Sequence, residues 1–390
     1  MTYGYSTAVS RRRDLTARST KSTYLRRLDW TLLIAALSLS GLGALLVWSA
    51  TKQRQLDANL DPESFLKKHL LNLAIGLLLG FVVSKFDYRL LRAYTPILYV
   101  GSILGLVAVL AVGATVNGAH AWIALPAGFT LQPSEFAKLA IILGMAMILS
   151  EKRDAEPEPK DRDVVLALLL AAIPAALIML QPDLGTVMVI FTIVVGVLAV
   201  SGARSRWTLG LLLGTVLVAG LAIHFDVIRP YQVDRLTAFA DPNSGSSSYG
   251  YNTQQSRIAI GSGGLTGQGL FKGAQTQGKF VPENQTDFVY SVAGEELGFV
   301  GSAAIILLLG VILWRGFVIA SRASDLFGRL VATGIICWFA FQAFENIGMN
   351  LGIMPVTGVP LPFVSYGGSS MFAGWMAIGL LQNIHLRRSD

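Results

Sequence analysis

W-T-L-L-I-A-A-L-S-L-S-G-L-G-A-L-L-V-W-S-A, residues 30–50, is an apolar run without a single Asp, Glu, Lys, Arg or His. About 20 such residues in a helix span the hydrocarbon core of a bilayer. Across all 390 residues, 53% are hydrophobic and 14% are charged, whereas a soluble protein carries about 25% charged residues. The chain is therefore predicted to be an integral membrane protein, with this first run as a retained signal anchor.

The same apolar signal recurs along the chain. Windows of about 20 apolar residues indicate ten candidate spans, at roughly 30–50, 69–84, 94–113, 132–150, 163–180, 186–201, 207–224, 293–314, 328–348 and 369–384. The expected architecture is all-α and polytopic, with about ten transmembrane helices between residues 30 and 384. A basic tail, residues 1–29, precedes this membrane domain, and a short tail, residues 385–390, follows it.

The distribution of Lys and Arg among the loops predicts which ends of the helices face the cytoplasm. Cytoplasmic loops of membrane proteins are enriched in Lys and Arg. With the N-terminus inside, 21 of the 31 Lys and Arg fall in inner segments, so both termini are predicted to be cytoplasmic. These short basic loops account for the net charge of +7. Membrane lipids are therefore expected as partners, and nucleic acid is not.

One outer segment, residues 225–287, is too long for a simple connector. It holds D-P-N-S-G-S-S-S-Y-G-Y (241–251), which is typical of a flexible tip. It also holds G-S-G-G-L-T-G-Q-G (261–269), which indicates tightly turning backbone. We therefore expect one large extracytoplasmic loop, and we expect the functional surface of the protein to face outward.

The acidic stretch V-P-E-N-Q-T-D-F-V-Y-S-V-A-G-E-E, residues 281–296, lies where this loop re-enters the membrane. An ionised side chain at the bilayer centre costs about 2.5–3.5 kcal/mol on insertion scales, so carboxylates gathered here indicate a site. Asp287 is the strongest candidate for a catalytic base, because a partly dehydrated carboxylate holds its proton more tightly. A helix cap formed by Asp287 is the alternative. The neighbouring acids are expected to support the site: Glu283, Glu295 and Glu296.

Q-P-S-E-F-A-K, residues 132–138, places Glu135 and Lys138 three residues apart, on one face of a predicted helix. Pro133 suits the first turn of that helix. The two charges either form a structural pair that fixes two helices or bind an anionic ligand through Lys138. The sequence leaves both interpretations open.

Three further residues are candidates for substrate binding, each with a simpler alternative. Trp122 lies in the outer loop N-G-A-H-A-W-I, where Trp usually serves as an anchor at the membrane interface. Asp183 lies in the turn Q-P-D-L-G-T (181–186), where Asp often caps a helix. Arg229 belongs to R-P-Y-Q-V-D-R-L (229–236); its guanidinium group suits phosphate, and an interfacial amphipathic helix is an equally good interpretation.

The segment G-I-M-P-V-T-G-V-P-L-P-F-V-S-Y-G-G-S-S, residues 352–370, holds three prolines and four glycines. Irregular backbone at membrane depth must be buried in protein or line a cavity. As a cavity wall, its backbone N–H groups and hydroxyl groups would contact a polar ligand. The hydroxyl-bearing candidates are Ser365, Tyr366, Ser369 and Ser370.

The sequence gives little support for cysteine or histidine chemistry. Cys337 is the single cysteine and lies in an apolar run, which excludes an intramolecular disulfide and a cysteine-based metal site. His120 has no carboxylate or cysteine neighbours, and a lone histidine does not make a metal site. Whether the protein binds a metal stays open at this point.

Five of these motifs, in their order along the chain, resemble those of the SEDS family (shape, elongation, division and sporulation). They are Q-P-S-E-F-A-K, Q-P-D-L-G-T, I-A-I-G-S-G-G-L-T-G-Q-G, P-E-N-Q-T-D-F and G-V-P-L-P-F-V-S-Y-G-G-S-S. The resemblance extends from Trp30 to Asn383. Within the family, Q-P-D-L-G-T and the run Q-S-R-I-A-I-G-S-G-G-L-T-G-Q-G favour the RodA-like elongation branch over the FtsW-like division branch.

The resemblance implies a peptidoglycan glycosyltransferase with ten spans in the bacterial cytoplasmic membrane. Its substrate would be lipid II, the undecaprenyl-diphosphate-linked disaccharide-pentapeptide. The enzyme would polymerise lipid II into β-1,4-linked glycan, with inversion, at the extracytoplasmic face. The essential aspartate of the family's T-D-F motif maps onto Asp287, and the glutamate and lysine of its Q-P-S-E-x-x-K motif map onto Glu135 and Lys138.

The resemblance also implies a partner, a class B penicillin-binding transpeptidase with one membrane span, which would cross-link the new strand. Lys138, Arg229 or a divalent cation, Mg²⁺ or Mn²⁺, would stabilise the departing diphosphate. Two departures from the family pattern are visible. This chain has Gln285 where many members have His, so that position is not expected to be an indispensable proton carrier. It also lacks the Arg that many members carry near His120.

Two other functions compete with the enzyme. A flippase that moves lipid II would need a polar path across the membrane, and the residues available to line it are Glu135, Lys138, Asp183 and Glu345. These residues gather at the outer end of the predicted helices, whereas a path also needs polar groups toward the inner leaflet. A scaffold that only holds a partner enzyme would leave Asp287 dispensable. A glycosyltransferase is the favoured function.

Overall fold

The computed structural model describes residue 24 and residues 26–116, 119–125, 129–151, 159–224 and 248–387. Within these ranges the protein is mostly helical, with thirteen helices and one small sheet. Ten long helices overlap the ten predicted spans: α2 (Trp30–Asp57), α3 (Ser64–Lys85), α4 (Tyr88–Val112), α5 (Pro133–Leu149), α6 (Asp161–Leu180), α7 (Leu184–Val200), α8 (Ser205–His224), α13 (Gly298–Ser321), α14 (Leu326–Leu351) and α15 (Gly368–Leu386). Three shorter helices lie between α8 and α13: α10 (Ser248–Ser262), α11 (Ala274–Gln277) and α12 (Val289–Glu296). The predicted polytopic helical architecture is confirmed.

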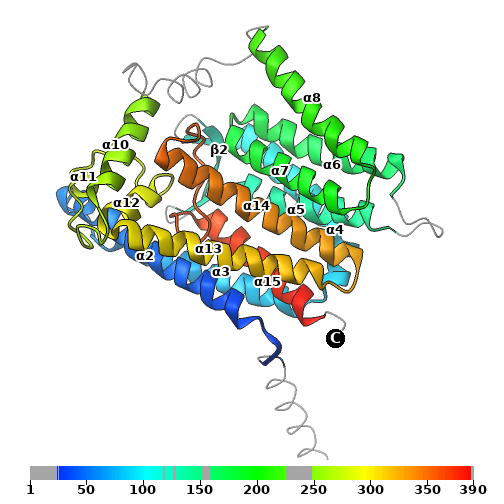
Figure 1. Ribbon diagram of the computed structural model, residues 1–390, viewed down its shortest axis with the longest axis horizontal. Helices are drawn as coiled ribbons and strands as arrows, with labels where there is room; N and C mark the ends of the chain where they lie inside the picture. The colour runs from blue at the N-terminus through cyan, green and yellow to red at the C-terminus, as the bar shows by residue number, and fades with distance from the viewer. Residues whose placement is uncertain are drawn as a thin grey trace, which may run out of the picture.

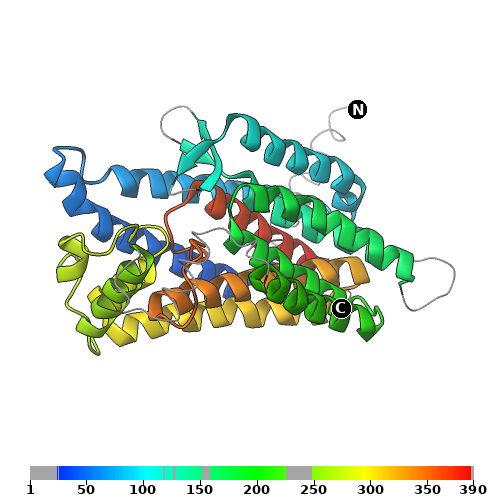
Figure 2. The ribbon, with the colours of Figure 1, turned by 90° about the horizontal axis from the view of Figure 1, so that it is seen from above.

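The long helices lie side by side, with α10, α11 and α12 gathered at one end and α8 standing away from the others (Figures 1 and 2). Six helices in the described ranges are long and apolar enough to cross a membrane, namely α2, α3, α4, α6, α13 and α14. The helix α7 is apolar but shorter. The protein is therefore an integral membrane protein.

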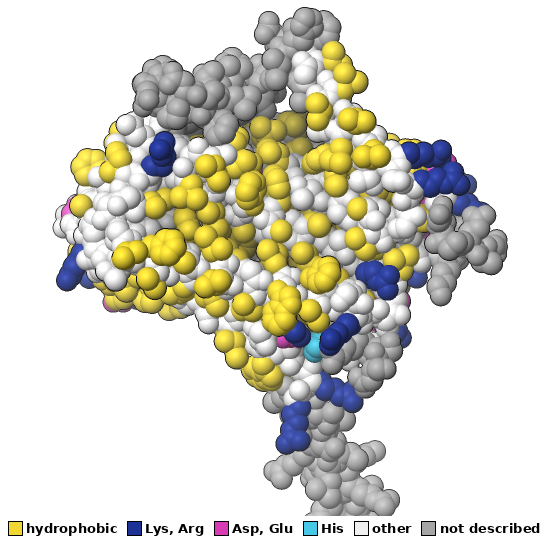
Figure 3. All heavy atoms as spheres, viewed as in Figure 1, with side chains coloured by type: hydrophobic (Ala, Val, Ile, Leu, Met, Phe, Trp, Pro, Cys, Tyr) yellow, Lys and Arg dark blue, Asp and Glu magenta, His cyan; other side chains and the backbone are white. Residues whose placement is uncertain are grey.

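The outer faces of these helices expose large hydrophobic side chains. Leu78, Ile97 and Leu213 are 61%, 67% and 70% exposed. Figure 3 shows hydrophobic side chains over the middle of one face, with Lys and Arg toward its margins. An apolar surface of this extent suits contact with lipid rather than water.

The helices α3 and α15 pack with their backbones in contact. A Cβ atom on Gly80 would lie 2.6 Å from the carbonyl oxygen of Trp375, and one on Gly379 would lie 2.3 Å from the carbonyl oxygen of Gly80. Near the start of α15, a Cβ on Gly76 would lie 3.2 Å from the carbonyl oxygen of Met371. Small residues permit such close approach between membrane helices. The start of α15 therefore packs directly against α3.

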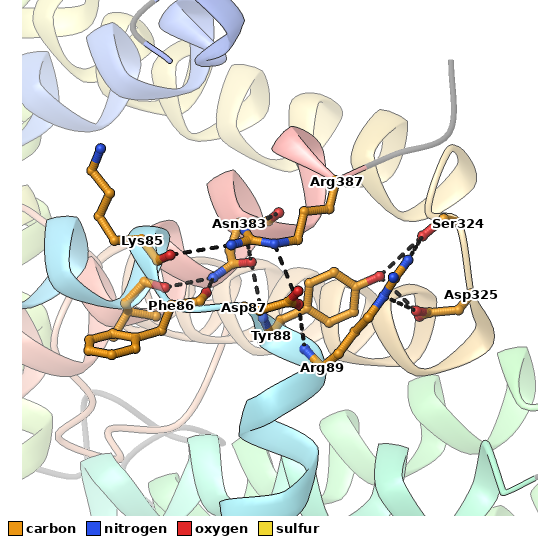
Figure 4. A network of polar contacts seen from close by, with 10 residues as sticks. Lys85, Phe86, Asp87, Tyr88, Arg89, Ser324, Asp325, Asn383 and Arg387 are labelled. Atoms are coloured by element: carbon orange, nitrogen blue, oxygen red, sulfur yellow. Dashed lines mark hydrogen bonds and ion pairs between the residues drawn. The ribbon is translucent and has the colours of Figure 1, made fainter. Parts of the chain in front are cut away.

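A network of polar contacts joins three parts of the chain (Figure 4). The Tyr88 hydroxyl donates to Asp325 Oδ2 at 2.7 Å, and the Tyr88 N–H donates to Asn383 Oδ1 at 3.2 Å. Arg387 pairs with Asp87 at 3.4 Å. The α3–α4 turn, the α13–α14 turn and the end of α15 are therefore held together.

A small antiparallel sheet follows α4 and departs from the all-α prediction. Its strands are β1 (Ala114–Val116), β2 (Ala119–Leu125) and β3 (Phe129–Leu131), in the order β1-β2-β3. The strands hold three to seven residues, too few to register in a window that searches for helical spans. The dipeptide Asn117-Gly118 between β1 and β2 is a hairpin signal in the sequence.

The predicted span at 293–314 is interrupted in the structure. The helix α12 ends at Glu296, and α13 begins at Gly298, whose φ is +64°. Such a break leaves carbonyl groups on one side and N–H groups on the other without helical partners. The glycine-rich run 261–269 caps both sides, and its turning backbone is confirmed. The hydrogen bonds run from Gln268 N to Glu295 O (2.9 Å), Gly269 N to Glu296 O (3.0 Å), Phe299 N to Gly264 O (2.9 Å) and Val300 N to Leu265 O (3.1 Å).

The predicted loop 225–287 contains a helix. Residues 248–262 form α10, so the last residues of the predicted flexible tip, 241–251, are helical instead. The run of polar residues there hides the helix from a search based on hydrophobicity. Residues 225–247 lie outside the described ranges.

We expect Gly267→Ala to destabilise the protein, whereas Gly261→Ala should leave its stability almost unchanged. Gly267 has a φ of +82°, and its Cβ would lie 2.2 Å from the carbonyl oxygen of Glu296. The left-handed conformation alone costs a non-glycine residue about 1–2 kcal/mol. A Cβ on Gly261 meets nothing within 4 Å. Thermal unfolding of both purified variants in detergent measures the difference. Equal unfolding midpoints would contradict the conclusion that the run 261–269 caps both α12 and α13.

Candidate functional site

The helix α14 carries three buried amide side chains, Gln342, Asn346 and Asn350, each at most 2% exposed. Their spacing of four residues places them on one face of the helix, and we name them the amide stripe. Each donates to backbone carbonyl groups of segments that lack regular structure. A buried polar group without a partner costs about 1–3 kcal/mol. The amide stripe therefore determines where these segments lie.

Two of these amides hold the residue expected to be the base. Asn346 Nδ2 donates to the carbonyl oxygens of Asp287 and Val359, at 2.8 Å each. Asn350 Nδ2 donates to the same Asp287 carbonyl at 3.0 Å, and Asn350 Oδ1 accepts from the Ser291 N–H at 3.1 Å. The backbone before α12 and the irregular loop before α15 are thus fastened to the same helix.

That irregular loop, residues 352–367, is called here the proline loop. It also bonds directly to the segment before α12. The Ser365 hydroxyl donates to the Thr286 carbonyl at 2.5 Å, and the Tyr366 N–H donates to the Gln285 carbonyl at 2.9 Å. The structure thus brings the predicted residues Ser365 and Tyr366 next to the Asp287 segment.

The Asp287 side chain is half-buried. Its Oδ2 lies 3.4 Å from the position that a Cβ on Gly358 would occupy, so the carboxylate rests against the backbone of the proline loop. Glu283 shapes the turn before Asp287. Its carbonyl oxygen accepts from the Thr286 N–H at 3.1 Å, and its carboxylate accepts from the Gln285 side chain at 3.1 Å. The predicted supporting acid Glu283 therefore helps to present Asp287.

Glu135 and Lys138 form a buried ion pair at the start of α5. Lys138 Nζ lies 2.7 Å from Glu135 Oε1, and the two side chains are 1% and 2% exposed. Lys138 Nζ also donates to Gln342 Oε1 at 3.2 Å and lies 4.5 Å from the centre of the Trp338 ring. Gln342 Nε2 in turn donates to the Pro360 carbonyl at 2.7 Å. The amide stripe therefore connects the ion pair to the proline loop, as the structural-pair interpretation expects.

Asp183 caps α7. Its Oδ1 accepts from the Thr186 N–H at 3.0 Å, and its Oδ2 accepts from the Thr186 hydroxyl at 2.8 Å, so the helix-cap interpretation is confirmed. Gln132 Nε2 donates to Asp183 Oδ2 at 3.2 Å, and the Gln132 N–H donates to Ser369 Oγ at 2.8 Å. Gln132 thus links the starts of α5, α7 and α15, and with them two of the predicted binding residues.

Glu295 and Glu296 make their hydrogen bonds elsewhere. The Glu295 carboxylate accepts from the N–H groups of Gln275 and Thr276 at 2.7 and 2.9 Å, at the start of α11. Glu296 Oε1 accepts from the Ser49 hydroxyl at 2.7 Å. Burial raises the pKa of Glu296. These two acids fasten the segment around α11 to α2 and α12, so the support that they give to the site is architectural.

The remaining predicted residues are spread more widely. The Tyr366 ring lies 5.1 Å from the Phe65 ring and 6.1 Å from the His69 ring, between centroids, and burial raises the pKa of the Tyr366 phenol. Trp122 is half-buried in β2, within the small sheet. Arg229 lies outside the described residues, so its role stays a prediction.

The amide stripe is not among the residues predicted from the sequence. Its signal was present as three amides at a spacing of four, Q-x-x-x-N-x-x-x-N (342–350), in an apolar run. Polar side chains in membrane helices usually face the interior of the bundle and find partners there. Glu345, which the sequence places near the outer end of its helix, is also fully buried.

Within the described ranges, no three His, Cys, Asp or Glu side chains are placed together so that they could hold a metal ion. The expected divalent cation, Mg²⁺ or Mn²⁺, therefore has no assigned ligands. The cation stays a prediction.

These features define a class of protein: a polytopic helical membrane protein with a half-buried carboxylate held among helix ends and irregular backbone. Residues 29–390 match the family model FTSW_RODA_SPOVE, described as cell cycle protein. The chain belongs to this family. The predicted membership in the SEDS family is thereby confirmed.

Similar proteins match almost the whole chain. Peptidoglycan glycosyltransferase MrdB of Escherichia coli K12 is 38% identical over 93% of this chain and 94% of its own. The rod shape determining protein RodA of Thermus thermophilus matches with a TM-score of 0.68 at 32% identity, over 93% of this chain and 98% of that one. A chain from the structure "Structural coordination of polymerization and crosslinking by a peptidoglycan synthase complex" matches with a TM-score of 0.77 at 33% identity, over 93% and 98%.

We expect Lys138→Met alone to destabilise the protein by about 3–5 kcal/mol, because it leaves the Glu135 carboxylate buried without its partner. Adding Glu135→Gln removes the second charge, so the double variant should recover much of the loss. A double-mutant cycle from thermal unfolding in detergent measures this coupling. Effects that simply add would show that the pair does not act as a unit.

Proposed function

We propose that this protein polymerises lipid II into β-1,4-linked glycan strands at the outer face of the cytoplasmic membrane. The observation that carries the proposal is the placement of Asp287, a half-buried carboxylate on backbone held by Asn346 and Asn350. A group positioned beforehand needs little reorganisation at the moment of reaction. The protein is a glycosyltransferase of its family, whose E. coli relative MrdB is named a peptidoglycan glycosyltransferase.

In the proposed reaction, Asp287 accepts the proton of the 4-hydroxyl of the acceptor sugar, or orients that hydroxyl. The hydroxyl oxygen attacks the anomeric carbon of the donor sugar as the bond to the lipid diphosphate breaks. The proton passes to Asp287, the lipid diphosphate leaves with the bonding electron pair, and the anomeric centre is inverted. One base suffices for this transfer, whereas glycosidases place two carboxyl groups around the bond.

The Glu135–Lys138 pair is proposed to position the site rather than to hold the diphosphate. Lys138 is 1% exposed, and its ammonium group already contacts Glu135, Gln342 and the Trp338 ring. Binding a diphosphate would require Lys138 to leave a buried carboxylate unpaired, which is strongly unfavourable. Through Gln342, the pair instead fixes the proline loop against which Asp287 lies.

The orientation in the membrane is part of the proposal. Ten crossings with both termini in the cytoplasm would place Asp287 at the extracytoplasmic face of the bacterial cytoplasmic membrane. The basic inner loops support this orientation. The start of α2 and the end of α15 also lie at one end, where the Asp29 N–H donates to Gln382 Oε1 at 3.0 Å and Arg315 pairs with Asp29 at 2.7 Å. Asp287 lies at the other end of α13 and α14.

The cellular role is proposed to be cell-wall elongation and rod shape. RodA of Thermus thermophilus, a rod shape determining protein, shares the fold over 93% of this chain. The family model also covers the FtsW branch, so a division-specific polymerase is the alternative. A class B penicillin-binding transpeptidase is the proposed partner, because one structural neighbour comes from a peptidoglycan synthase complex with polymerisation and crosslinking.

Asp287→Asn is expected to lower lipid II polymerisation at least about 100-fold, the usual contribution of a general base, because the amide cannot accept the hydroxyl proton. Purified protein in lipid vesicles, with glycan products separated on gels, provides the measurement. Asp61→Asn is the matched control. It changes an exposed carboxylate paired with Lys67 in the α2–α3 turn, and it should retain activity. Near-normal glycan output from folded Asp287→Asn protein would refute the role of Asp287.

A further inference from the structure

The N-terminus of α15 differs from the two helix N-termini that Gln132 links to it. The helix α5 carries Glu135 in its first turn, and α7 is capped by Asp183. In contrast, α15 has no acidic residue in its first turn, its N-cap is Gly367, and no capping hydrogen bond from a side chain is found there among the described residues. A helix N-terminus presents unpaired N–H groups and about half a positive charge. This charge is left without a protein carboxylate in the first turn of α15.

Two buried polar side chains of α3 lie beside this helix end. His69 is 0% exposed, and neither of its ring nitrogens has a hydrogen-bond partner in the described part of the chain. Asn72 is 2% exposed, and its Oδ1 has no partner there either. Their spacing of three residues places both on one face of α3. Buried polar groups are nearly always hydrogen-bonded, so these two point to a ligand.

The Asn72 amide lies against the start of α15, and the His69 ring lies against Tyr366, two residues before that start. The three atoms nearest to a Cβ position on Gly368 all belong to the Asn72 amide, at 3.4–3.6 Å. The His69 ring stacks on Tyr366, with centroids 6.1 Å apart and an interplanar angle of 28°. Because residue 368 is a glycine, the space between the Asn72 amide and the helix end is not filled by a side chain.

This combination of groups suits an anion with several oxygen atoms. A histidine has at least one ring N–H, and the NH₂ group of an asparagine amide is a donor. Together with the first N–H groups of α15, these side chains form a set of donors. Phosphate is the anion that helix N-termini commonly bind.

We infer that the N-terminus of α15, with His69 and Asn72, is a subsite for phosphate carried on a lipid. The inference rests on the proposed function, because the leaving group of that reaction is a lipid diphosphate. Its position is suitable, since the Tyr366 N–H bonds to Gln285, two residues before Asp287. Donors placed at the departing diphosphate stabilise the negative charge that develops there.

Binding of undecaprenyl diphosphate to the purified full-length protein tests the subsite. Asn72→Asp keeps the shape of the side chain and adds a negative charge, so the affinity should fall at least about 10-fold. Gly368→Ala places a methyl group between Asn72 and the helix end at ordinary contact distances, and it should also weaken binding. His69→Leu should weaken binding too, whereas His69→Gln keeps a donor and should recover part of the affinity.

Two matched controls separate the subsite from general effects. Asn59→Asp adds the same charge at an exposed position, and Gly41→Ala adds the same methyl group where nothing lies within 4 Å. Both controls should bind undecaprenyl diphosphate as the wild type does. If Asn72→Asp protein does not fold, the Gly368→Ala result decides.

Unchanged affinity for undecaprenyl diphosphate in the folded Asn72→Asp or Gly368→Ala protein would overturn the inference. Phosphatidylglycerol vesicles identify the source of the phosphate. If Asn72→Asp weakens phosphatidylglycerol binding as much, the subsite takes a membrane phospholipid, and its assignment to the leaving group is wrong. Lipid II polymerisation is measured on the same preparations. Wild-type protein that binds the lipid diphosphate without polymerising lipid II would refute the proposed function and leave the subsite standing.

Discussion

One buried amide, that of Asn346, joins the two irregular segments on which the site depends. Its Nδ2 donates to the carbonyl oxygens of Asp287 and Val359, at 2.8 Å each. Irregular backbone at membrane depth needs such partners within the protein, because lipid offers none. The prolines and glycines of the proline loop prevent a regular ladder of hydrogen bonds there, and side chains of α14 supply the missing partners. The position of Asp287 therefore follows from a side chain on a neighbouring helix.

The backbone around Asp287 is held by hydrogen bonds, whereas its carboxylate is partly exposed. Ser365 donates to the Thr286 carbonyl and Asn350 donates to the Asp287 carbonyl. Gln342 accepts from Lys138 of the Glu135–Lys138 pair and donates to the Pro360 carbonyl, so it connects the pair to the proline loop. A functional side chain that is locked by its neighbours keeps its geometry during turnover. The start of α15 is different, because buried polar atoms of His69 and Asn72 in α3 lie there without hydrogen-bond partners among the described residues. The site thus combines a carboxylate on firmly held backbone with a neighbouring helix end that carries the inferred phosphate subsite.

The helical architecture could be predicted because the length of an apolar run is a local property, and a run such as 30–50 lies within one helix. Turn chemistry is also local, so the cap at Asp183 and the tight backbone at 261–269 could be predicted too. The amide stripe could not be assigned a role, because its partners lie up to 204 residues away along the chain. The helix α10 and the small sheet were missed because neither carries a long apolar run.

Hydrogen–deuterium exchange of Asn346→Leu protein in detergent tests most directly whether this amide organises the site. Leucine has a similarly branched side chain and favours the helix, but it cannot donate to either carbonyl group. Faster exchange than in the wild type is predicted in both residues 284–288 and residues 356–366, with α2 and α3 unchanged. Exchange that is unaltered in these two segments, or faster only in α14 around the substitution, would contradict the central role of Asn346.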